Sequence, residues 1–191
     1  MRVVVFREQP EGDPPREHVA ILFGNPLAHP DDVLVRMHSE CLTSEVFGSL
    51  KCDCREQLLG AIERIQAQGS GIVIYLRQEG RGIGLGNKIR AYALQAQGLD
   101  TVQANHQLGF EADLRRYDVA TGMLADLGVR AVSLMTNNPK KIDALDRGGI
   151  RVVRRVPHEF APTLHSARYL STKRARLGHL LDLAGLGGPE D

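Results

Sequence analysis

Three short apolar runs dominate the first third of the chain. They lie at Arg2–Phe6, Val19–Phe23 and Val33–Met37, and the turn-rich stretches Pro10–Pro15 and Asn25–Asp32 separate them. Short β-branched runs bounded by turn residues are typical of strands. We therefore expect the chain to begin with antiparallel strands.

From Glu56 onward the spacing of the apolar residues becomes helical. Four apolar residues share one face of the predicted helix: Leu58, Leu59, Ile62 and Ile65. Gly69 can end this helix, because glycine adopts the left-handed conformation at a C-terminus. The next segment, Ile72–Leu76, is apolar throughout and is expected to form a strand.

Helices and strands alternate along the remainder of the chain. The expected helices are Asn87–Gln97 ended by Gly98, Asp118–Leu127 ended by Gly128, a helix from Pro139 through Asp146 with Asn138 as its N-cap, and a terminal helical region at Leu164–Leu183. The expected strands are Ala131–Met135 and Ile150–Val156. This alternation predicts an α/β fold with an α+β tendency: a mixed sheet with N-terminal antiparallel strands, flanking helices and a C-terminal helix. Functional loops are then expected at the strand ends.

The composition of the chain indicates how many domains it forms and which classes of binding partner it disfavours. The 191 residues, 42% of them apolar, suffice for one core, which we expect over residues 1–184, with a flexible tail over residues 185–191. The 24 Lys and Arg nearly balance the 23 Asp and Glu, so no overall field favours nucleic acid or a membrane surface. No apolar run approaches the roughly 18 residues of a membrane span, and the first residues do not resemble a signal peptide. We expect a cytoplasmic protein whose anion site, if any, is local.

All three cysteines lie in one short segment. Cys41, Cys52 and Cys54 have the spacing C-x10-C-x-C, and an odd, clustered set indicates metal or redox chemistry rather than a disulfide framework. Three protein ligands with an open fourth position are typical of catalytic zinc sites. The spacing favours this open site over a closed one completed by a residue such as His38, and over ordinary buried cysteines.

A glycine-rich segment, RQEGRGIGLG at residues 77–86, joins the strand Ile72–Leu76 to the next predicted helix. Backbone N–H groups and arginines in such a loop can bind an anion near a helix N-terminus. The segment matches neither a Walker loop nor a dinucleotide fingerprint, and a tight turn with solvated charges is the alternative. Glu79 adds specificity, because a carboxylate can accept two hydrogens from the edge of guanine while arginines hold phosphates.

Two further polar segments lie in the second half of the chain. TNNPKK at residues 136–141 stands where a strand gives way to a helix, which suits a phosphate, although a capped helix with solvated lysines fits equally. NHQLGF at residues 105–110 is followed by Asp113 and Arg115 and, by its spacing alone, is expected to be a polar loop.

Together these segments closely resemble the GTP cyclohydrolase II family over about residues 33–157, with a weaker match at Tyr169–Leu181. The motifs that carry the resemblance are RMHSECLTSEVFGSLKCDC, RQEGRGIGLGNKIRAYALQAQGLDTV, ANHQLGFEADLRRYDVA and TNNPKK. The chain departs from the family pattern at Thr43-Ser44-Glu45, at Arg55 and in His158–Ala167, which lacks an asparagine-containing approach to the Tyr-Leu-x-Thr-Lys segment.

The resemblance assigns a role to each motif. The implied zinc ligands are Cys41, Cys52 and Cys54, and the implied catalytic residues are Tyr92, Asp113 and Arg115. The implied contacts to GTP come from Arg36, His38, Ser39, Glu40, Gln57, Glu79, Gly80, Arg81, Thr101, Thr136 and Lys141. The family also implies magnesium with the GTP phosphates and a homodimer.

The implied reaction is the first step of riboflavin biosynthesis. GTP is hydrolysed at guanine C8, with formate release, and at the α-phosphate, with pyrophosphate release, giving 2,5-diamino-6-ribosylamino-4(3H)-pyrimidinone 5′-phosphate. Zinc lowers the pKa of bound water to about 7, and Tyr92 can orient that water or stabilise developing charge. The family proposal makes Arg115 a nucleophile with Asp113 as its base. A guanidinium is almost wholly protonated, so an Arg115 phosphate clamp beside a water activated by Asp113 is equally consistent.

Two other functions stay open on the sequence. A zinc-stabilised nucleotide-binding module would need the cysteines but not Glu79, Arg81, Tyr92 or Lys141, and it would release no formate. A specialised paralogue would open the ring and stop at the formamidopyrimidine nucleotide, although the presence of Tyr92 argues against this.

Overall fold

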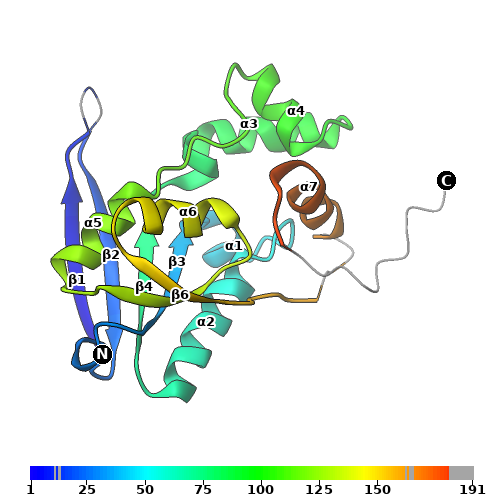
Figure 1. Cartoon of the computed structure of the whole chain (residues 1–191). Coiled ribbons are helices and arrows are strands. Elements are labelled where there is room, and N and C mark those ends of the chain that lie inside the picture. Colours follow the sequence, from blue (N-terminus) through cyan, green and yellow to red (C-terminus); the bar gives the residue numbers. More distant parts are fainter. Residues whose placement is uncertain (11, 13, 162, 164–165, 181–191) are drawn as a thin grey trace.

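The computed structural model describes residues 1–10, 12, 14–161, 163 and 166–180. Six strands form one mixed sheet in the order β1-β2-β4-β3-β5-β6 (Figure 1). The strands are β1 (Arg2–Glu8), β2 (Arg16–Phe23), β3 (Val33–Ser39), β4 (Gly71–Leu76), β5 (Ala131–Met135) and β6 (Arg151–Val156). β2 is antiparallel to both β1 and β4, whereas β4, β3, β5 and β6 run parallel to one another. The predicted α/β fold, with antiparallel strands at the start, is confirmed.

Helices connect the parallel strands and extend beyond them. They are α1 (Leu42–Glu45), α2 (Cys54–Gln68), α3 (Gly84–Ala96), α4 (Thr101–Gln107), α5 (Asp118–Asp126), α6 (Pro139–Arg147) and α7 (Ala167–Leu177), with 3-10 turns at Pro26–Ala28 and Glu79–Gly82. The predicted caps are confirmed: Gly69 ends α2 with a φ of 86°. At the start of α6, the Asn138 side chain accepts a hydrogen bond of 3.1 Å from the backbone N–H of Lys140.

The segment between α3 and α5 differs from the expectation. α3 begins at Gly84 rather than Asn87, whose side chain lies inside the first turn and donates to the Ile83 carbonyl at 3.0 Å. The expected polar loop NHQLGF is wrong in its first half, which belongs to α4. Asp100 and Gln103 explain the difference, because they form a capping box in which the Asp100 carboxylate accepts from the Gln103 N–H at 2.9 Å.

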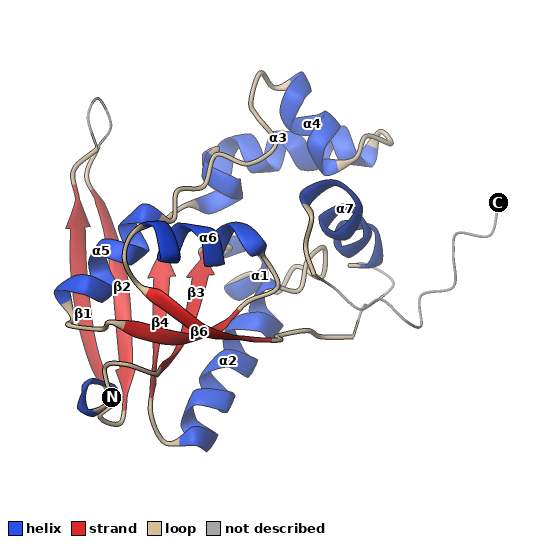
Figure 2. Cartoon of the chain, in the orientation of Figure 1, coloured by secondary structure: helices blue, strands red, loops and turns tan. Residues whose placement is uncertain are grey.

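Helices cover both faces of the sheet (Figure 2). α5 and α6 pack on one face, where Ile72, Ile74 and Leu134 are fully buried. α2 packs on the other face, against Val73 and Met135. Successive residues of a strand point to opposite faces. Burial of both faces therefore explains why β4 is apolar throughout.

At the carboxyl edge of the parallel strands, different strands lead to helices on different faces of the sheet. β3 leads to α2 on one face, whereas β5 leads to α6 on the other. Such a switch point leaves a crevice at the strand ends. α3 and α4 lie beyond this edge, with α7 beside them (Figure 1). α7 falls within the predicted terminal helical region, while the predicted tail lies outside the described residues. In the part of the chain that the structure describes, no helix could cross a membrane.

Candidate active site

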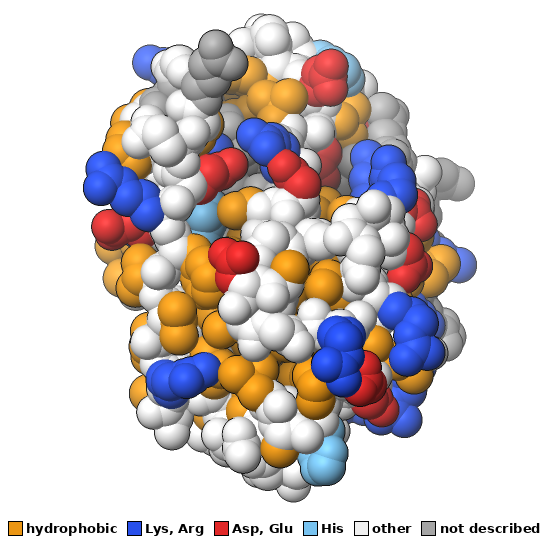
Figure 3. All heavy atoms as spheres, turned by 60° about the vertical axis from the view of Figure 1, so that its left-hand side comes forward, with side chains coloured by type: hydrophobic (Ala, Val, Ile, Leu, Met, Phe, Trp, Pro, Cys, Tyr) orange, Lys and Arg blue, Asp and Glu red, His pale blue; other side chains and the backbone are white. Residues whose placement is uncertain are grey.

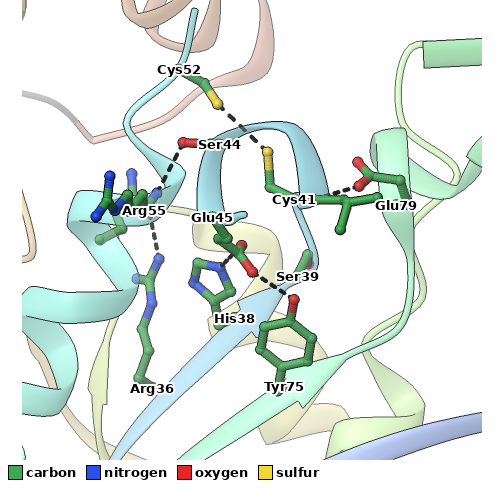
Figure 4. A network of polar contacts seen from close by, with 12 residues as sticks. Arg36, His38, Ser39, Cys41, Ser44, Glu45, Cys52, Arg55, Tyr75 and Glu79 are labelled. Atoms are coloured by element: carbon green, nitrogen blue, oxygen red, sulfur yellow. Dashed lines mark hydrogen bonds and ion pairs between the residues drawn. The ribbon is translucent and has the colours of Figure 1, made fainter. Parts of the chain in front are cut away.

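The three cysteines meet at the carboxyl end of β3. Cys41 lies two residues after the end of β3, and Cys52 and Cys54 stand at the start of α2. Their Sγ atoms all lie within 4.8 Å of one another, and those of Cys41 and Cys52 are 3.6 Å apart (Figure 4). His38 is turned away, with Nε2 2.7 Å from Glu45 Oε1. Within the described residues, the cluster that could hold a metal ion therefore consists of the three cysteines.

Lys88, which the sequence analysis did not select, lies between this cluster and the glycine-rich loop. Its Nζ donates to Cys41 Sγ at 3.1 Å and to Glu79 Oε1 at 2.8 Å. Hydrogen bonds from the Cys52 and Cys54 thiols, together with the Lys88 ammonium, lower the pKa of Cys41. A lowered pKa favours the thiolate, which is the form that binds a metal.

Two charged residues of the glycine-rich loop, Glu79 and Arg81, are largely buried, which contradicts a turn whose charges are all solvated, although Arg77 is exposed. Arg81 is only 9% exposed and has a φ of 64°, a left-handed conformation that costs a non-glycine residue about 1–3 kcal/mol. The Arg81 carbonyl accepts from the backbone N–H of Leu114 at 3.0 Å. The Glu79 carboxylate accepts from the N–H groups of Leu42 and Gly80, each at 2.7 Å. These contacts hold the loop against the segment that carries Cys41.

A first cavity of about 680 Å³ opens beside the thiols. The predicted site residues that line it are Ser39, Glu40, Cys41, Cys52, Cys54, Glu79, Gly80, Arg81, Tyr92, Thr101 and Arg115. The Tyr92 ring lines the same cavity, and the Nζ atom of Lys51 lies 4.7 Å from the ring centroid. Burial raises the pKa of Tyr92 to about 12, so its phenol keeps its proton at neutral pH and can donate a hydrogen bond.

Arg115 is held by Asp113 through two parallel hydrogen bonds. Nε donates to Oδ1 at 2.8 Å and Nη2 donates to Oδ2 at 2.6 Å, while the Arg115 backbone N–H donates to Oδ1 at 3.1 Å. Burial alone would raise the pKa of Asp113, but the hydrogen bonds and charge of Arg115 outweigh it and lower the pKa to about 2. The carboxylate is therefore ionised and fixes the guanidinium in one orientation.

A second cavity, of about 550 Å³, lies between the ends of β3 and β5. Its lining consists of Arg36, His38, Ser39, Cys54, Gln57, Arg115, Thr136, Asn137, Asn138, Lys141, Lys173 and His179. This lining contains four cations and no carboxylate. Lys141 donates to the Met37 carbonyl at 2.7 Å, and burial together with the charges of Arg36 and Arg115 lowers its pKa. Such a cationic cavity fits an anion.

The two cavities adjoin, because Ser39, Cys54 and Arg115 line both of them. Between them they bring together every predicted site residue except Asp113, which is bonded to Arg115. Arg115 thus faces both the cavity that all three cysteines line and the cavity that Arg36, Lys141 and Lys173 line.

Sequence departures from the family pattern lie directly behind these cavities. Glu45 bridges two side chains, since Oε1 lies 2.7 Å from His38 Nε2 and Oε2 accepts from the Tyr75 hydroxyl at 2.5 Å (Figure 4). Ser44 Oγ accepts from the backbone N–H of Arg55 at 3.3 Å, which joins the two departures Ser44 and Arg55. Both contacts stabilise the part of the cavity lining that contains His38 and the cysteines.

Several functional candidates escaped the sequence analysis. Lys88 sits in a helical pattern where a lysine is usually solvated, so the local pattern alone does not distinguish it. Asp53 lies between two cysteines, and its Oδ1 accepts from Lys173 Nζ at 3.1 Å. Asn137 belongs to the TNNPKK motif, and its side chain bonds both the backbone N–H and the carbonyl of His158. Lys88, Asp53 and Asn137 all lie inside the motifs that carry the family resemblance, which were the signal available for them.

Comparison with known proteins agrees with this geometry. The sequence model of the GTP cyclohydrolase II family matches residues 1–157. GTP cyclohydrolase-2 of Saccharophagus degradans is 53% identical over 165 residues, covering 86% of this chain and 82% of that protein. GTP cyclohydrolase-2 of Teredinibacter turnerae is 54% identical over 167 residues, covering 87% and 83%. The riboflavin biosynthesis protein RibBA of Bacillus subtilis is 53% identical over 166 residues, covering 87% of this chain and 42% of that longer protein. The chain therefore belongs to the GTP cyclohydrolase II family.

Proposed function

We propose that the adjoining cavities bind one molecule of GTP and that the protein catalyses the first step of riboflavin biosynthesis. The guanine occupies the cavity beside the thiols, and the phosphates occupy the cationic cavity. The observation that carries this proposal is the shared wall: Cys54 and Arg115 line both cavities, so a metal-binding cluster and a phosphate clamp face one ligand. Hydrolysis at C8 and at the α-phosphate can then occur on the same substrate.

The thiol cluster fits zinc. Three thiolates bound tetrahedrally at about 2.3 Å lie roughly 3.8 Å apart, and the Sγ atoms of Cys41 and Cys52 are 3.6 Å apart. We infer that Cys41, Cys52 and Cys54 hold this ion, which activates water for hydrolysis at C8 and of the formyl group. Lys88 stabilises the thiolate form of Cys41 by charge.

The base is read by the loop around Glu79. A carboxylate has about four lone-pair sites, and the Glu79 carboxylate already accepts from Leu42, Gly80 and Lys88 in the described structure. About one site therefore remains, so Glu79 accepts from both guanine N1–H and N2–H₂ when the base displaces one of these donors, such as the Lys88 ammonium. Tyr92, which keeps its proton, donates to the charge that develops at the ring during hydrolysis.

The phosphates are bound by the cations of the second cavity. An anion there relieves the repulsion that lowers the pKa of Lys141. Arg115 clamps the α-phosphate, and Asp113 orients it. With a pKa of about 2, Asp113 is a weak base, which favours this clamp over proton transfer from Arg115 to Asp113. We expect magnesium to accompany the phosphates, since hard oxygen ligands suit that ion.

The decisive experiment is incubation of the purified protein with GTP, zinc and magnesium, followed by mass analysis of the products. We expect formate, pyrophosphate and the diaminopyrimidine nucleotide in equal amounts. Accumulation of the formamidopyrimidine nucleotide would instead identify the specialised paralogue. Binding of GTP without any product would identify a nucleotide-binding module.

We further infer that residues 1–184 act as one catalytic unit and that two copies form a homodimer. Support comes from the edge strand β1, on which Val3 and Val5 are 53% and 57% exposed. Figure 3, in which the β1 side is turned forward, shows hydrophobic side chains gathered on this face. Light scattering tests the dimer, and a monomer at the concentration used in the activity assay would contradict it.

A further inference from the structure

α7 lies beyond residue 157, the last residue that the family sequence model covers, in the segment where the family resemblance is weaker, yet it supplies part of the cationic cavity. Lys173 on α7 and His179 just after it line this cavity together with Arg115 and Lys141. Lys173 is only 7% exposed. Neither residue belongs to the set that the family motifs assign to GTP, so the family resemblance does not explain why they line this cavity.

Specific contacts hold α7 in this position. Lys173 Nζ donates to Asp53 Oδ1 at 3.1 Å, and Leu170 is 2% exposed. Gly178 has a φ of 65°, a left-handed conformation that ends α7 and lets the His179 N–H donate to the Lys173 carbonyl at 3.2 Å. This turn brings His179 back to the cavity that Lys173 lines.

The next residue fastens this turn to the sheet. The backbone N–H of Leu180 donates to the Asn137 carbonyl at 2.8 Å. Asn137 follows β5 and itself lines the cavity. The position of α7 is therefore tied to the start of α2, through Asp53, and to the carboxyl end of β5.

The charges around the cavity favour the binding of a polyanion. Arg36, Arg115, Lys141 and Lys173 all line it, and the two carboxylates that pair with them, Asp53 and Asp113, do not. Burial and the positive charges of Lys173 and Arg115 lower the pKa of His179 to about 3, so its imidazole is neutral and can still donate one N–H. Buried cations that repel one another are stabilised when an anion binds among them.

We propose that Lys173 and His179 are phosphate-binding residues of the GTP site, which α7 places in the cavity that the TNNPKK segment also lines. This inference rests on the proposed function, because it names further contacts for the same nucleotide. Lys173 supplies a charge-assisted hydrogen bond and His179 a neutral one. The ordering of α7 then contributes to phosphate affinity and not to recognition of the base.

The test compares Lys173→Met with Arg174→Met, a matched control on the exposed side of the same helix. Zinc-loaded protein is titrated with inorganic tripolyphosphate and, separately, with guanosine, and the KM for GTP is measured. A hydrogen bond to a charged group contributes about 1.5–3 kcal/mol, so Lys173→Met should weaken tripolyphosphate binding about 10- to 100-fold and raise the KM similarly. Guanosine affinity and zinc content should not change, and Lys173→Arg should restore most of the affinity.

His179→Gln provides a second test of the proposal, because this variant leaves the Lys173–Asp53 pair in place. It should weaken tripolyphosphate binding about 5-fold, as expected for one neutral hydrogen bond. The proposal is overturned if both variants bind tripolyphosphate like the wild type. It is also overturned if Lys173→Met loses zinc and weakens guanosine equally, since Lys173 would then act only through Asp53. A wild type that releases formate from GTP separates these failures from failure of the proposed function, whereas a wild type that binds neither tripolyphosphate nor GTP refutes both.

Discussion

Replacement of Asp113 by asparagine should disable chemistry at the α-phosphate while leaving the thiol cluster intact. The Asp113 carboxylate accepts three hydrogen bonds from Arg115, and its side chain is 9% exposed. Asparagine keeps the shape but removes the charge and presents an NH₂ group where the guanidinium donates. Arg115 should then leave its position between the two cavities.

The pKa of Asp113 gives the magnitude of the effect on stability. Its fall from the ordinary 3.8 to about 2 corresponds to roughly 2 kcal/mol. A carboxyl whose pKa is lowered by folding contributes this stability above about pH 4, and the contribution is lost as the pH falls through about 2. At pH 7 the variant should therefore lose all of it, and its Tm should fall by about 5 °C.

The assay follows formate, pyrophosphate and zinc content together. Displacement of a positioning group by about 1 Å can cost about 100-fold in rate, so pyrophosphate release should fall by about that factor while zinc content stays unchanged. Asp118→Asn is the matched control, because Asp118 pairs with Arg116 in the same two-residue spacing but at the surface. Exposed pairs contribute about 0–1 kcal/mol, so this control should behave like the wild type.

Two results would refute this reasoning. The first is pyrophosphate release in Asp113→Asn within about 3-fold of the wild type, far short of the loss expected from a misplaced clamp. The second concerns pH: with a pKa of about 2, Asp113 stays ionised between pH 5 and 9, so the rate should show no acid limb from this residue. An acid limb near neutrality that disappears in Asp113→Asn would establish a general base instead of a support for Arg115.

Three further predictions concern the thiols and the base. Cys52→Ala should lower zinc from about one ion per chain to near zero in elemental analysis, and an undiminished content would remove the metal from the mechanism. GTP should be preferred over ATP by at least about 10-fold in kcat/KM, because adenine offers Glu79 no paired donors; comparable turnover of ATP would rule out base reading by Glu79. Cys54→Ser should abolish formate release while pyrophosphate still leaves and GMP accumulates. Loss of both activities in folded Cys54→Ser protein would show that the two hydrolyses are coupled through the metal.

Most features that could be predicted from the sequence depend on residues that lie close together along the chain. The alternation of strands and helices follows from side-chain periodicity, and the caps Gly69 and Asn138 depend on neighbours within a few residues. The cysteine spacing indicated a candidate metal site for the same reason, since two of the three cysteines are separated by one residue. The capping box at Asp100 and Gln103 was equally local and could have been found, but the NHQLGF segment was read only by its polar composition.

The assembly of the site depended on contacts that no local pattern contains. Lys88 reaches Cys41 across 47 positions of the chain, and Lys173 reaches Asp53 across 120. Such pairs form because the strand order places the ends of β3, β4 and β5 at one edge, where helices from distant segments converge. The family resemblance named most of the proposed nucleotide contacts, but it carried no information on which cations share a cavity. Only the tertiary structure decided that Arg115 lies between a thiol cluster and a cationic cavity, because burial and charge at that edge are collective properties of the whole fold.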